Sequence, residues 1–428
     1  MLNIYLCTMF ALVDANNFFV SCEKVFRPDL EGKPVVVLSN NDGCIISRSN
    51  EAKALGLQMG EPYFKRKKFL KDNNVTVFSG NYSLYGDMSR RVMQTLRELA
   101  PDVEIYSIDE AFLDLSGIEE KFLIPYASKI KRTVEQWTAI PVSIGVGKTK
   151  TLAKLASEAV KKHRIKTGVL ILNKPETIEN LLKQTAIEDI WGIGYRWGKK
   201  LKEDFIYTAY DFVKMSDFYI KKKMGISGLR IKHELLGQSA FEMHNLPEAK
   251  KSIRRSRSFG ILIEKKDDLE EAIANFADAC AYKLRQKKEV AYNITVYIKT
   301  DKHRKDLAQY RNSITITLKS PSNGSKTIIN AALEGLNQIY KEGFKYRKAG
   351  VVVTGLEPAS NIQLNLFEKG ETYKEQNLMK TIDLIRNKYG RNSIEFAIEK
   401  GNGNWRPRQL HISPKYTTDW KDLPEIKN

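Results

Sequence analysis

The chain has 428 residues, of which 42% are hydrophobic, so it is long enough for several folded domains that each bury their own core. Lysine and arginine outnumber aspartate and glutamate by 70 to 51, and the net charge of +19 favours a polyanionic partner, with nucleic acid as the first candidate. The four cysteines form neither a CxxC pair nor a zinc pattern with histidine, which excludes a zinc finger and a disulfide scaffold and indicates a reducing cytoplasm.

The chain begins with an apolar run, MLNIYLCTMFALV, that stops at Asp14. This run lacks a basic leading region and is shorter than the ~20 residues that a membrane span needs, so we expect a buried strand. Met9 stands directly before FALVD, and Met1 and Met9 are both candidate starts of the protein.

The pattern then changes along the chain. From Met9 to about Asn173, short apolar runs alternate with helical segments such as 82–99, which is typical of an α+β or α/β domain. Residues 175–245 look helical and basic, and 254–356 predict a second α+β domain with helices near 270–287 and 327–340. The remainder is polar, with one helix near 375–389, and we expect it to be partly ordered at best.

Three carboxylates stand in apolar surroundings. Asp14 ends one predicted strand, and Asp109 and Glu110 interrupt another, EIYSIDEAFLDL. A buried carboxylate is costly without a cation, so we expect Asp14 and Asp109 to face one cavity and bind a pair of hard cations, with Glu110 at the rim. Two such metals serve phosphoryl and nucleotidyl transfer. The alternative is that each acid faces solvent or an arginine. Asp114, further along the strand, is expected to have a structural role.

The segment GVGKTKT invites a P-loop interpretation. A P-loop requires a glycine five residues before Gly147, but that position is Val142, so an ATPase is excluded. Lys154 and Lys161 follow on a predicted helix, and their spacing of seven residues places both on one face.

Three segments together resemble the Y-family translesion DNA polymerases, namely VDANNFFVSCE, YSIDEAFLDLSG and VSIGVGKTKTLAKLASEAVKK. Others are similar to the UmuC subgroup, the catalytic subunit of the bacterial SOS mutagenesis polymerase: NNDGCIISRSNEAKALGLQMGEP, NYSLYGDMS, WGIG, SRSFG, QLNLF and SPKYTTDW. The similarity runs from about Met9 to the C-terminus, and so many motifs in one order argue against coincidence.

The resemblance implies an α+β multidomain fold of the right-hand polymerase type. It assigns a catalytic palm to 1–20 and 81–173, fingers to 21–80, a helical thumb with a helix-hairpin-helix to 174–248, an α+β little finger to 253–357 and a C-terminal tail to 358–428. The implied activity is template-directed, error-prone translesion DNA synthesis in the SOS response to DNA damage, without proofreading.

The resemblance also implies roles for single residues at the substrate. Asp14, Asp109 and Glu110 become the catalytic acids, holding two Mg²⁺ ions for which Mn²⁺ can substitute. Phe19 resembles the steric gate whose ring excludes a ribose 2′-hydroxyl, and its neighbour Phe18 is the more tightly packed ring of the pair. The triphosphate-binding set is Lys53, Lys161 and Asn50, where Asn50 replaces a tyrosine that the family often has. Without the motif, Phe19 would be interpreted as a core aromatic residue.

Two further sites are expected to contact DNA. Gly192 and Gly194, in WGIG, resemble a hairpin whose backbone amides approach a phosphate, although a tight turn without a ligand is the alternative. Arg254, Arg255 and Arg257 precede a predicted strand and look like a little-finger edge along the DNA backbone, with a disordered basic tether as the alternative. Either arrangement predicts salt-sensitive binding with little base discrimination.

The peptide QLNLF lies in a polar region after the last predicted strand, and exposed apolar residues in such a region typically mark a docking site. It resembles the peptide that bacterial polymerases insert into the sliding clamp, and a short strand packed on the little finger is the alternative. The residues concerned are Gln363, Leu364, Leu366 and Phe367.

The partners implied are primer-template DNA, deoxynucleotides, the sliding clamp, and a UmuD-like subunit and RecA as further candidates. Two rival functions remain to be tested. One is a DNA-binding, clamp-docking regulatory protein that has lost activity, against which the intact acid triad argues. The other is a palm-fold nucleotidyl cyclase, which would need neither the basic thumb nor QLNLF.

Overall fold

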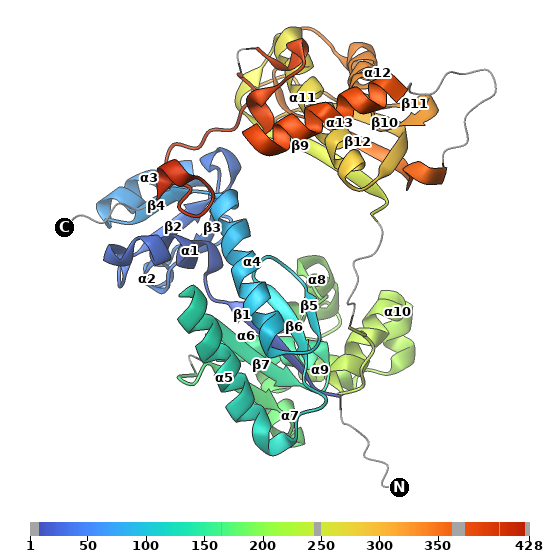
Figure 1. The fold of residues 1–428 in the computed structure, drawn as a ribbon. Helices are drawn as coiled ribbons and strands as arrows, with labels where there is room; N and C mark the ends of the chain where they lie inside the picture. Colours follow the sequence, from blue (N-terminus) through green and yellow to red (C-terminus); the bar gives the residue numbers. More distant parts are fainter. Residues whose placement is uncertain (1–7, 164, 244–249, 362–372, 402, 424–428) are drawn as a thin grey trace. The chain divides into compact units, whose positions relative to one another are not determined.

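The computed structural model describes residues 8–163, 165–243, 250–361, 373–401 and 403–423 (Figure 1). They form two compact units, which we describe separately. The first unit comprises Met1–Ser39, Cys44–Pro247 and His411–Asn428, and the second comprises Asn40–Gly43 and Glu248–Leu410. No helix in the described ranges is both long and apolar enough to cross a membrane.

The centre of the first unit is a five-stranded sheet with the order β5-β6-β1-β7-β8. Strand β1 pairs antiparallel with β6 on one side and β7 on the other, and β7 pairs parallel with β8. The strands are β1 (Phe10–Ala15), β5 (Val103–Ile105), β6 (Glu110–Asp114), β7 (Val142–Gly147) and β8 (Val169–Leu172). The predicted opening strand is confirmed from Phe10 onward, and residues 1–7 lie outside the described ranges.

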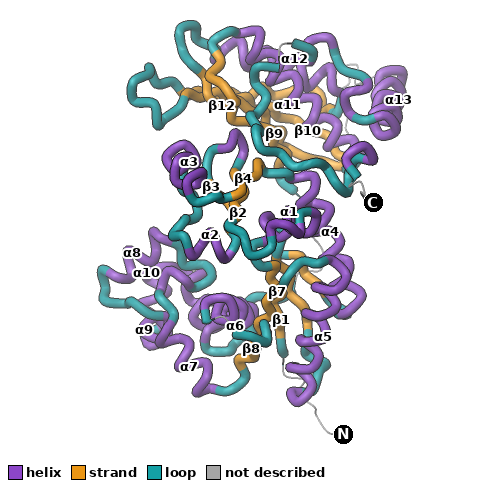
Figure 2. Tube along the Cα trace, turned by 90° about the vertical axis from the view of Figure 1, so that its left-hand side faces the viewer, coloured by secondary structure: helices purple, strands orange, loops and turns teal. Residues whose placement is uncertain are grey.

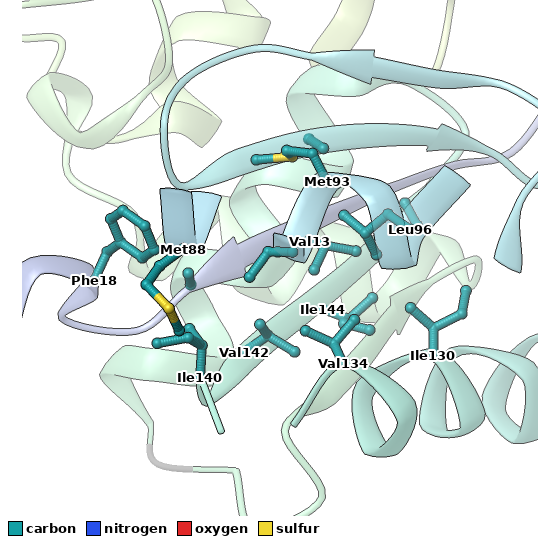
Figure 3. Close-up of a cluster of buried hydrophobic side chains, with 14 of the residues drawn as sticks. Val13, Phe18, Met88, Met93, Leu96, Ile130, Val134, Ile140, Val142 and Ile144 are labelled. Atoms are coloured by element: carbon teal, nitrogen blue, oxygen red, sulfur yellow. The ribbon is translucent and has the colours of Figure 1, made fainter. Parts of the chain in front are cut away.

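Helices cover both faces of this sheet. On one face, α4 (Tyr82–Leu99) and α5 (Glu120–Thr138) enclose a core that contains Val13, Met88, Leu96, Ile130 and Val134 (Figure 3). On the other face, α6 (Lys150–Lys162) packs against β1 and β7. The bounds of α4 match the predicted helix at 82–99.

Alternation along β1 decides which residues face each layer of helices. Ala11 and Val13 point into the core below α4 and α5, whereas Leu12 joins Phe112 and Ala153 on the α6 side. Because side chains alternate along a strand, Asp14 shares the α6 side with Leu12. The catalytic candidate therefore faces α6.

The predicted strand EIYSIDEAFLDL is in fact a hairpin, because β5 ends at Ile105 and β6 begins at Glu110. Ser107 stabilises the bend, since its hydroxyl oxygen accepts hydrogen bonds from the backbone N–H groups of Asp109 (3.3 Å) and Glu110 (3.0 Å). Such local side-chain bonds compete with a continuous strand. The expectation that Asp109 and Glu110 share one strand was wrong: Asp109 lies on the bend and Glu110 starts β6.

A smaller sheet with the order β3-β2-β4 has its own core, in the region predicted as fingers. Its strands are β2 (Val35–Leu38), β3 (Ile45–Arg48) and β4 (Thr76–Ser79), and the helices of this region are α1 (Phe18–Phe26), α2 (Asn50–Ala54) and α3 (Tyr63–Asp72). Helix α1 connects this region to the larger sheet, because its buried residues Phe18, Val20 and Cys22 join the core below α4 and α5.

The region predicted as thumb is helical, as expected. Its helices are α7 (Pro175–Gln184), α8 (Tyr195–Lys202), α9 (Ala209–Lys214) and α10 (Asp217–Leu235). Their core includes Leu152, Leu155 and Ala156 of α6, so the helical region packs on the same helix that faces Asp14.

The second unit is built on an antiparallel sheet with the order β11-β10-β12-β9. The strands are β9 (Ser252–Ile263), β10 (Glu289–Thr300), β11 (Arg311–Ser322) and β12 (Tyr346–Pro358). Helices α11 (Lys266–Gln286) and α12 (Ser325–Ile339) share a core with these strands. The second predicted α+β domain is thus present; in Figure 2 its strands are orange and its helices purple.

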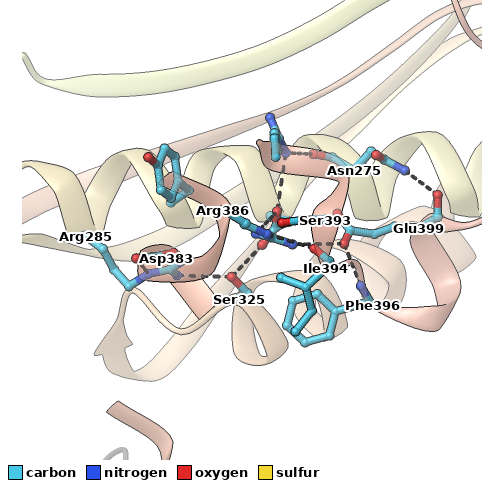
Figure 4. Close-up of polar contacts among 12 residues, drawn as sticks. Asn275, Arg285, Ser325, Asp383, Arg386, Ser393, Ile394, Phe396 and Glu399 are labelled. Carbon is cyan, nitrogen blue, oxygen red and sulfur yellow. Dashed lines mark hydrogen bonds and ion pairs between the residues drawn. The ribbon is translucent and has the colours of Figure 1, made fainter. Parts of the chain in front are cut away.

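The C-terminal region contains the helix that the sequence predicted near 375–389. Helix α13 (Tyr373–Tyr389) packs on α11 of the second unit, where Arg285 forms an ion pair with Asp383 (2.7 Å) and buried Arg386 with buried Asp278 (2.8 Å) (Figure 4). The chain then continues from the second unit into the first, which includes residues from His411 onward. A polar composition concealed this packing because the contacts join residues that are far apart in sequence.

Candidate active site

Asp14 and Glu110 lie directly opposite each other in the antiparallel pair of β1 and β6. Directly opposite residues place their side chains on the same face of a sheet, so both carboxylates face α6. Both line one cavity of about 140 Å³ together with Lys154. Asp14 is 7% exposed, which makes an unneutralised charge there expensive.

Two lysines of α6 neutralise these acids. Lys161 Nζ lies 2.5 Å from an oxygen of Asp14, and Lys154 Nζ lies 2.8 and 2.9 Å from the two oxygens of Glu110. Burial raises the pKa of Asp14 to about 7, although the ammonium group of Lys161 acts in the opposite direction and the charge of Glu110 adds to the rise. The pair of acids therefore favours cations in its surroundings.

Asp109 occupies the adjoining bend. Its carbonyl oxygen accepts a hydrogen bond from the Ala15 N–H (2.8 Å), so its backbone lies beside the end of β1. Its carboxylate accepts a hydrogen bond from the Ser107 hydroxyl (2.5 Å). We expected Asp14 and Asp109 to face one cavity with Glu110 at the rim, whereas the cavity that Asp14 lines is shared with Glu110.

The side chains that Asp14 and Glu110 bring to their shared cavity are carboxylates. Within the described ranges, no three Asp, Glu, His or Cys side chains gather closely enough to hold a metal. Asp14 and Glu110 nevertheless offer carboxylate oxygens, the ligands that hard cations prefer, and each already has a positive charge beside it. These residues fit a cation, since a metal can take the place of an ammonium group.

A second cavity, of about 690 Å³, brings together the residues expected to bind the triphosphate. Its lining includes Asn50, Lys53 and Lys161. Burial lowers the pKa of Lys53, and the positive charges of Arg48 and Lys161 lower it further. Cations held this close repel one another, so an anion that binds between them gains from all of them.

Phe19 is half-buried at the start of α1, and its ring has aromatic partners on α4. It stacks on Tyr85 with ring centres 4.7 Å apart and meets the edge of Tyr82 at 6.2 Å. Phe18 is 3% exposed and belongs to the core, as expected for the packed member of the pair. The motif NYSLYGDMS contained both tyrosines, but only the fold shows which ring they contact.

Lys154 also lies over two aromatic rings that the sequence analysis did not single out. Its Nζ is 4.9 Å from the centre of Tyr106 and 5.9 Å from that of Trp191. The indole N–H of Trp191 donates to the Tyr106 hydroxyl (2.9 Å), which links the helical region to the β5–β6 hairpin. Lys154 is therefore held by Glu110 and two aromatic rings and is not a lysine of a solvated helical surface.

The two glycines of WGIG differ in backbone conformation and in the space around them. Gly192 has a φ of +93°, and a Cβ there would lie 2.8 Å from Ile231, so the turn and its packing explain it. A Cβ on Gly194 would meet nothing within 4 Å. Gly194 caps the N-terminus of α8 and leaves its backbone open to close approach. Gly192 therefore has a structural role, whereas the position of Gly194 at a helix N-terminus suits binding of an anion.

The arginines expected just before a strand lie inside it, because β9 begins at Ser252 and pairs with β12 throughout Ser252–Ser258. The alternative of a disordered tether is therefore wrong. Arg254 is exposed and lies over the ring of Tyr297 at 4.9 Å, whereas Arg255 is partly buried near Cys280 of α11. Arg257 is exposed.

The open face of this sheet carries a row of like charges. Lys299 of β10 lies directly opposite Arg311 of β11 on one side and Lys348 of β12 on the other. Like charges directly opposite each other destabilise a sheet, so the arrangement suits a polyanion that neutralises them. Sequence analysis missed these residues because their proximity depends on the register of three strands.

The residues of the expected clamp peptide, Gln363, Leu364, Leu366 and Phe367, lie outside the described residues.

Residues 13–158 match the impB/mucB/samB family, 250–366 match its C-terminal domain, and 376–426 match a domain of unknown function (DUF4113). The chain is 42% identical to the protein UmuC of Salmonella typhimurium strain LT2 over 98% of this chain and 100% of that protein. It is 28% identical to DNA polymerase IV of Oceanobacillus iheyensis over 92% of this chain and 93% of that protein.

A solved structure, the Y-family DNA polymerase chimera Dbh-Dpo4(243-245)-Dbh, matches the fold with a TM-score of 0.62 at 23% identity. The match covers 83% of this chain and 100% of the chimera. The fold is therefore that of a Y-family DNA polymerase, with palm, fingers, thumb and little finger. Within that class, the chain belongs to the impB/mucB/samB family, and its similarity to UmuC covers the whole length of that protein.

Proposed function

We propose that this chain is a template-directed DNA polymerase that carries out error-prone translesion synthesis in the SOS response, in the cytoplasm of a bacterium. The observation that carries the assignment is the pairing of Asp14 with Glu110 below Lys154 and Lys161 of α6. An acidic pair beside a cation-lined cavity is the combination that nucleotidyl transfer requires, and the relatives named UmuC and DNA polymerase IV agree with it.

Divalent cations are a general requirement of Y-family DNA polymerases, and we propose two Mg²⁺ ions held by Asp14, Asp109 and Glu110. Bound there, the ions would lower the pKa of the primer 3′-hydroxyl and neutralise charge on the phosphates. Buried Asp14 and its partner Glu110 supply oxygens on one face, and Asp109 supplies another from the adjoining bend.

The chain's own cations complete the site. Lys53 and Lys161 line one cavity, where they would bind the triphosphate and receive the leaving pyrophosphate. Lys161 is paired with Asp14 in this structure, so it would exchange that partner for a phosphate when nucleotide binds. Catalysis on this scheme consists of positioning and charge neutralisation.

Phe19 is proposed as the residue that selects the sugar. Its ring stands at the start of α1, close to Asn17, whose side-chain amide donates to Asn50 of the same cavity (3.2 Å). An aromatic ring packed from behind by Tyr85 cannot easily retreat, so a 2′-hydroxyl in front of it would clash.

DNA would be held by two sequence-independent surfaces. The open N-terminus of α8 at Gly194 suits a backbone phosphate, and the row of Arg311, Lys299 and Lys348 suits a second stretch of backbone. Arg254 of β9 lies on the same open face, because it is directly opposite Val352 of β12, which is directly opposite Thr295 of β10. Thr295 and Lys299 are four residues apart on one strand and so share a face.

A primer-extension assay tests the polymerase assignment. The full chain with Mg²⁺, a primer-template and deoxynucleotides should extend the primer, and should continue past an abasic site in the template. An inactive regulatory protein would bind the DNA and yield no product in either case. A nucleotidyl cyclase would consume free nucleotide without primer or template.

Recruitment by the sliding clamp is proposed from the peptide QLNLF alone. Tethering would raise the concentration of a weak polymerase at a stalled primer end. A variant that lacks residues 363–367 should lose binding to an immobilised clamp but keep extension of short primers, and retained binding would contradict the proposal. A UmuD-like subunit and RecA are proposed as accessory partners, to be tested by adding each to the lesion-bypass assay.

A further inference from the structure

The C-terminal segment His411–Tyr416 is an integral part of the first unit. His411 donates its backbone N–H to Ser79 Oγ (2.9 Å) and accepts a hydrogen bond from the Ser79 N–H (2.9 Å), at the end of β4. The ring of Tyr416 stacks on Phe26 of α1 with centres 4.6 Å apart. Ser413, between them, is 6% exposed. The segment therefore packs like an internal element of the catalytic unit.

Ser413 joins this segment to the first turn of α4. The side-chain amide of Asn81 lies within hydrogen-bonding distance of Ser413 Oγ (3.0 Å) and of the carbonyl oxygens of Ser413 (3.2 Å) and Pro414 (3.1 Å). The other end of the same side chain caps α4, because its oxygen accepts from the Leu84 N–H (3.3 Å). Asn81 is 2% exposed, so water does not replace these bonds.

The Ser413 hydroxyl also donates to a buried acid. Glu23 of α1 is 0% exposed, and its Oε1 accepts hydrogen bonds from Ser413 Oγ (3.0 Å) and from the Tyr85 hydroxyl (2.6 Å). Its Oε2 has no hydrogen-bond partner among the described residues. Burial raises the pKa of Glu23, whereas the hydrogen bonds that Oε1 accepts from Tyr85 and Ser413 lower it.

Tyr85 carries the connection to the sugar-selecting ring. It is 0% exposed, and its ring stacks on Phe19 with centres 4.7 Å apart and planes 22° apart. Among the described residues, the hydrogen-bond partner of its hydroxyl is Glu23. A continuous set of contacts thus runs from Ser413 through Glu23 and Tyr85 to Phe19.

We propose that Ser413 is a positioning residue for sugar selection: its hydroxyl holds Glu23, which holds the Tyr85 ring flat against Phe19. The proposal rests on the assignment of Phe19 as the steric gate. It also gives a role to part of the domain of unknown function at 376–426, namely completion of the wall behind the gate. Nothing in local sequence connects these residues, since Glu23 and Ser413 are 390 positions apart.

The test compares incorporation of ribonucleotides and deoxynucleotides by the full chain. Ser413→Ala should raise the ratio of ribonucleotide to deoxynucleotide kcat/KM about fivefold, the factor expected for loss of one buried hydrogen bond. Ser413→Thr keeps the hydroxyl and should restore the parent ratio. Thr418→Ala removes an exposed hydroxyl from the same C-terminal region and serves as the matched control. A folded Ser413→Ala protein with the parent ratio would overturn the proposal.

A second variant tests the route through Glu23. Tyr85→Phe keeps the stacked ring but removes its hydroxyl, so it should loosen selection as Ser413→Ala does. The double variant should show no more than the larger single effect, because both changes act on one acceptor. Additive effects would refute this route, and the Tyr85→Phe result decides the matter even if Ser413→Ala fails to fold.

Phe19→Ala separates this inference from the proposed gate. If Phe19→Ala admits ribonucleotides while Ser413→Ala and Tyr85→Phe do not, the gate stands and the positioning role fails. If Phe19→Ala leaves the ratio unchanged, the gate assignment itself fails, and the positioning role fails with it.

Discussion

Asp14 and Glu110 lie directly opposite each other on the antiparallel strands β1 and β6. Each carboxylate forms an ion pair with a lysine of α6, Asp14 with Lys161 and Glu110 with Lys154. The register of one strand pair thus places two acids together, and one helix supplies both counter-charges.

Removal of either acid should abolish nucleotide transfer. Asp14→Asn and Glu110→Gln keep the size of the side chain but remove the charge that would bind a cation, so kcat in primer extension should fall by about 10³-fold or more. Asp114→Asn is the control on strand β6, because the Asp114 carboxylate accepts hydrogen bonds from the N–H and hydroxyl of Ser116. Equal losses in all three variants would point to a folding defect instead.

Lys161→Met should weaken nucleotide binding. Lys161 lines the cavity that also contains Lys53, and a charge-assisted contact with phosphate is worth about 1.5–3 kcal/mol, so KM for deoxynucleotide should rise about 10–100-fold. The neighbouring Lys162→Met is the control, since Lys162 is exposed and lies 3.6 Å from Asp189. An unchanged KM for Lys161→Met would exclude a phosphate contact.

Lys299→Gln should lower DNA affinity and reduce its dependence on salt. Removal of one phosphate contact reduces the slope of log K against log salt by about one. The variant should also unfold at a slightly higher temperature, because Lys299 lies opposite both Arg311 and Lys348. Binding of a labelled primer-template at several salt concentrations measures the slope. Lys388→Gln, an exposed lysine on α13, should leave it unchanged.

Arg386→Met should strongly destabilise the second unit. Arg386 is 6% exposed, pairs with fully buried Asp278 at 2.8 Å and donates to the Ile394 carbonyl at 3.0 Å (Figure 4). Loss of one partner of a buried ion pair costs about 3–5 kcal/mol, since the other charge stays buried. Urea unfolding of the full chain measures the loss, with Lys388→Met as the control on the same helix. A change below about 1 kcal/mol would mean that Arg391, 3.3 Å from Asp278, suffices.

Stability should decline as pH rises from about 4.5 to 7 because of Glu399. Burial and then the charge of Asp278 raise the pKa of Glu399 from 4.5 to about 7, although Arg386 and Arg391 oppose the rise. The unfolded chain releases this proton near pH 4.5 and the folded chain only near pH 7. The contribution of Glu399 to the unfolding free energy is therefore at its maximum below pH 4.5, and it falls until the pH has passed 7.

Glu399→Gln should remove this part of the pH dependence, which amounts to about 3 kcal/mol. Glutamine keeps an oxygen for the Phe396 N–H, which donates to Glu399 at 2.9 Å. The measurement is the difference in unfolding free energy between parent and variant across this pH range. The exposed Glu395→Gln should follow the parent curve, and a Glu399→Gln curve parallel to the parent would contradict the assignment.

The elements of the candidate site were predictable where the signal is local. Alternation of apolar residues and the motif around Asp14 indicated a strand that ends in an acid, and helix α4 follows the periodicity of 82–99. The error at EIYSIDEAFLDL also has a local cause. Ser107 stabilises a bend inside a run with strand composition, and its hydrogen bonds outweigh propensity.

The class of chemistry could be predicted from the sequence, because acids in apolar strands, lysines on one helical face and an ordered series of motifs are all readable along the chain. The acid that shares the cavity with Asp14 could not be predicted in this way, since its identity depends on the register of β1 against β6. The same holds for the charged row on the second sheet and for the bond from Ser413 to Glu23. Contacts between distant residues follow from packing and strand pairing, which no local pattern specifies.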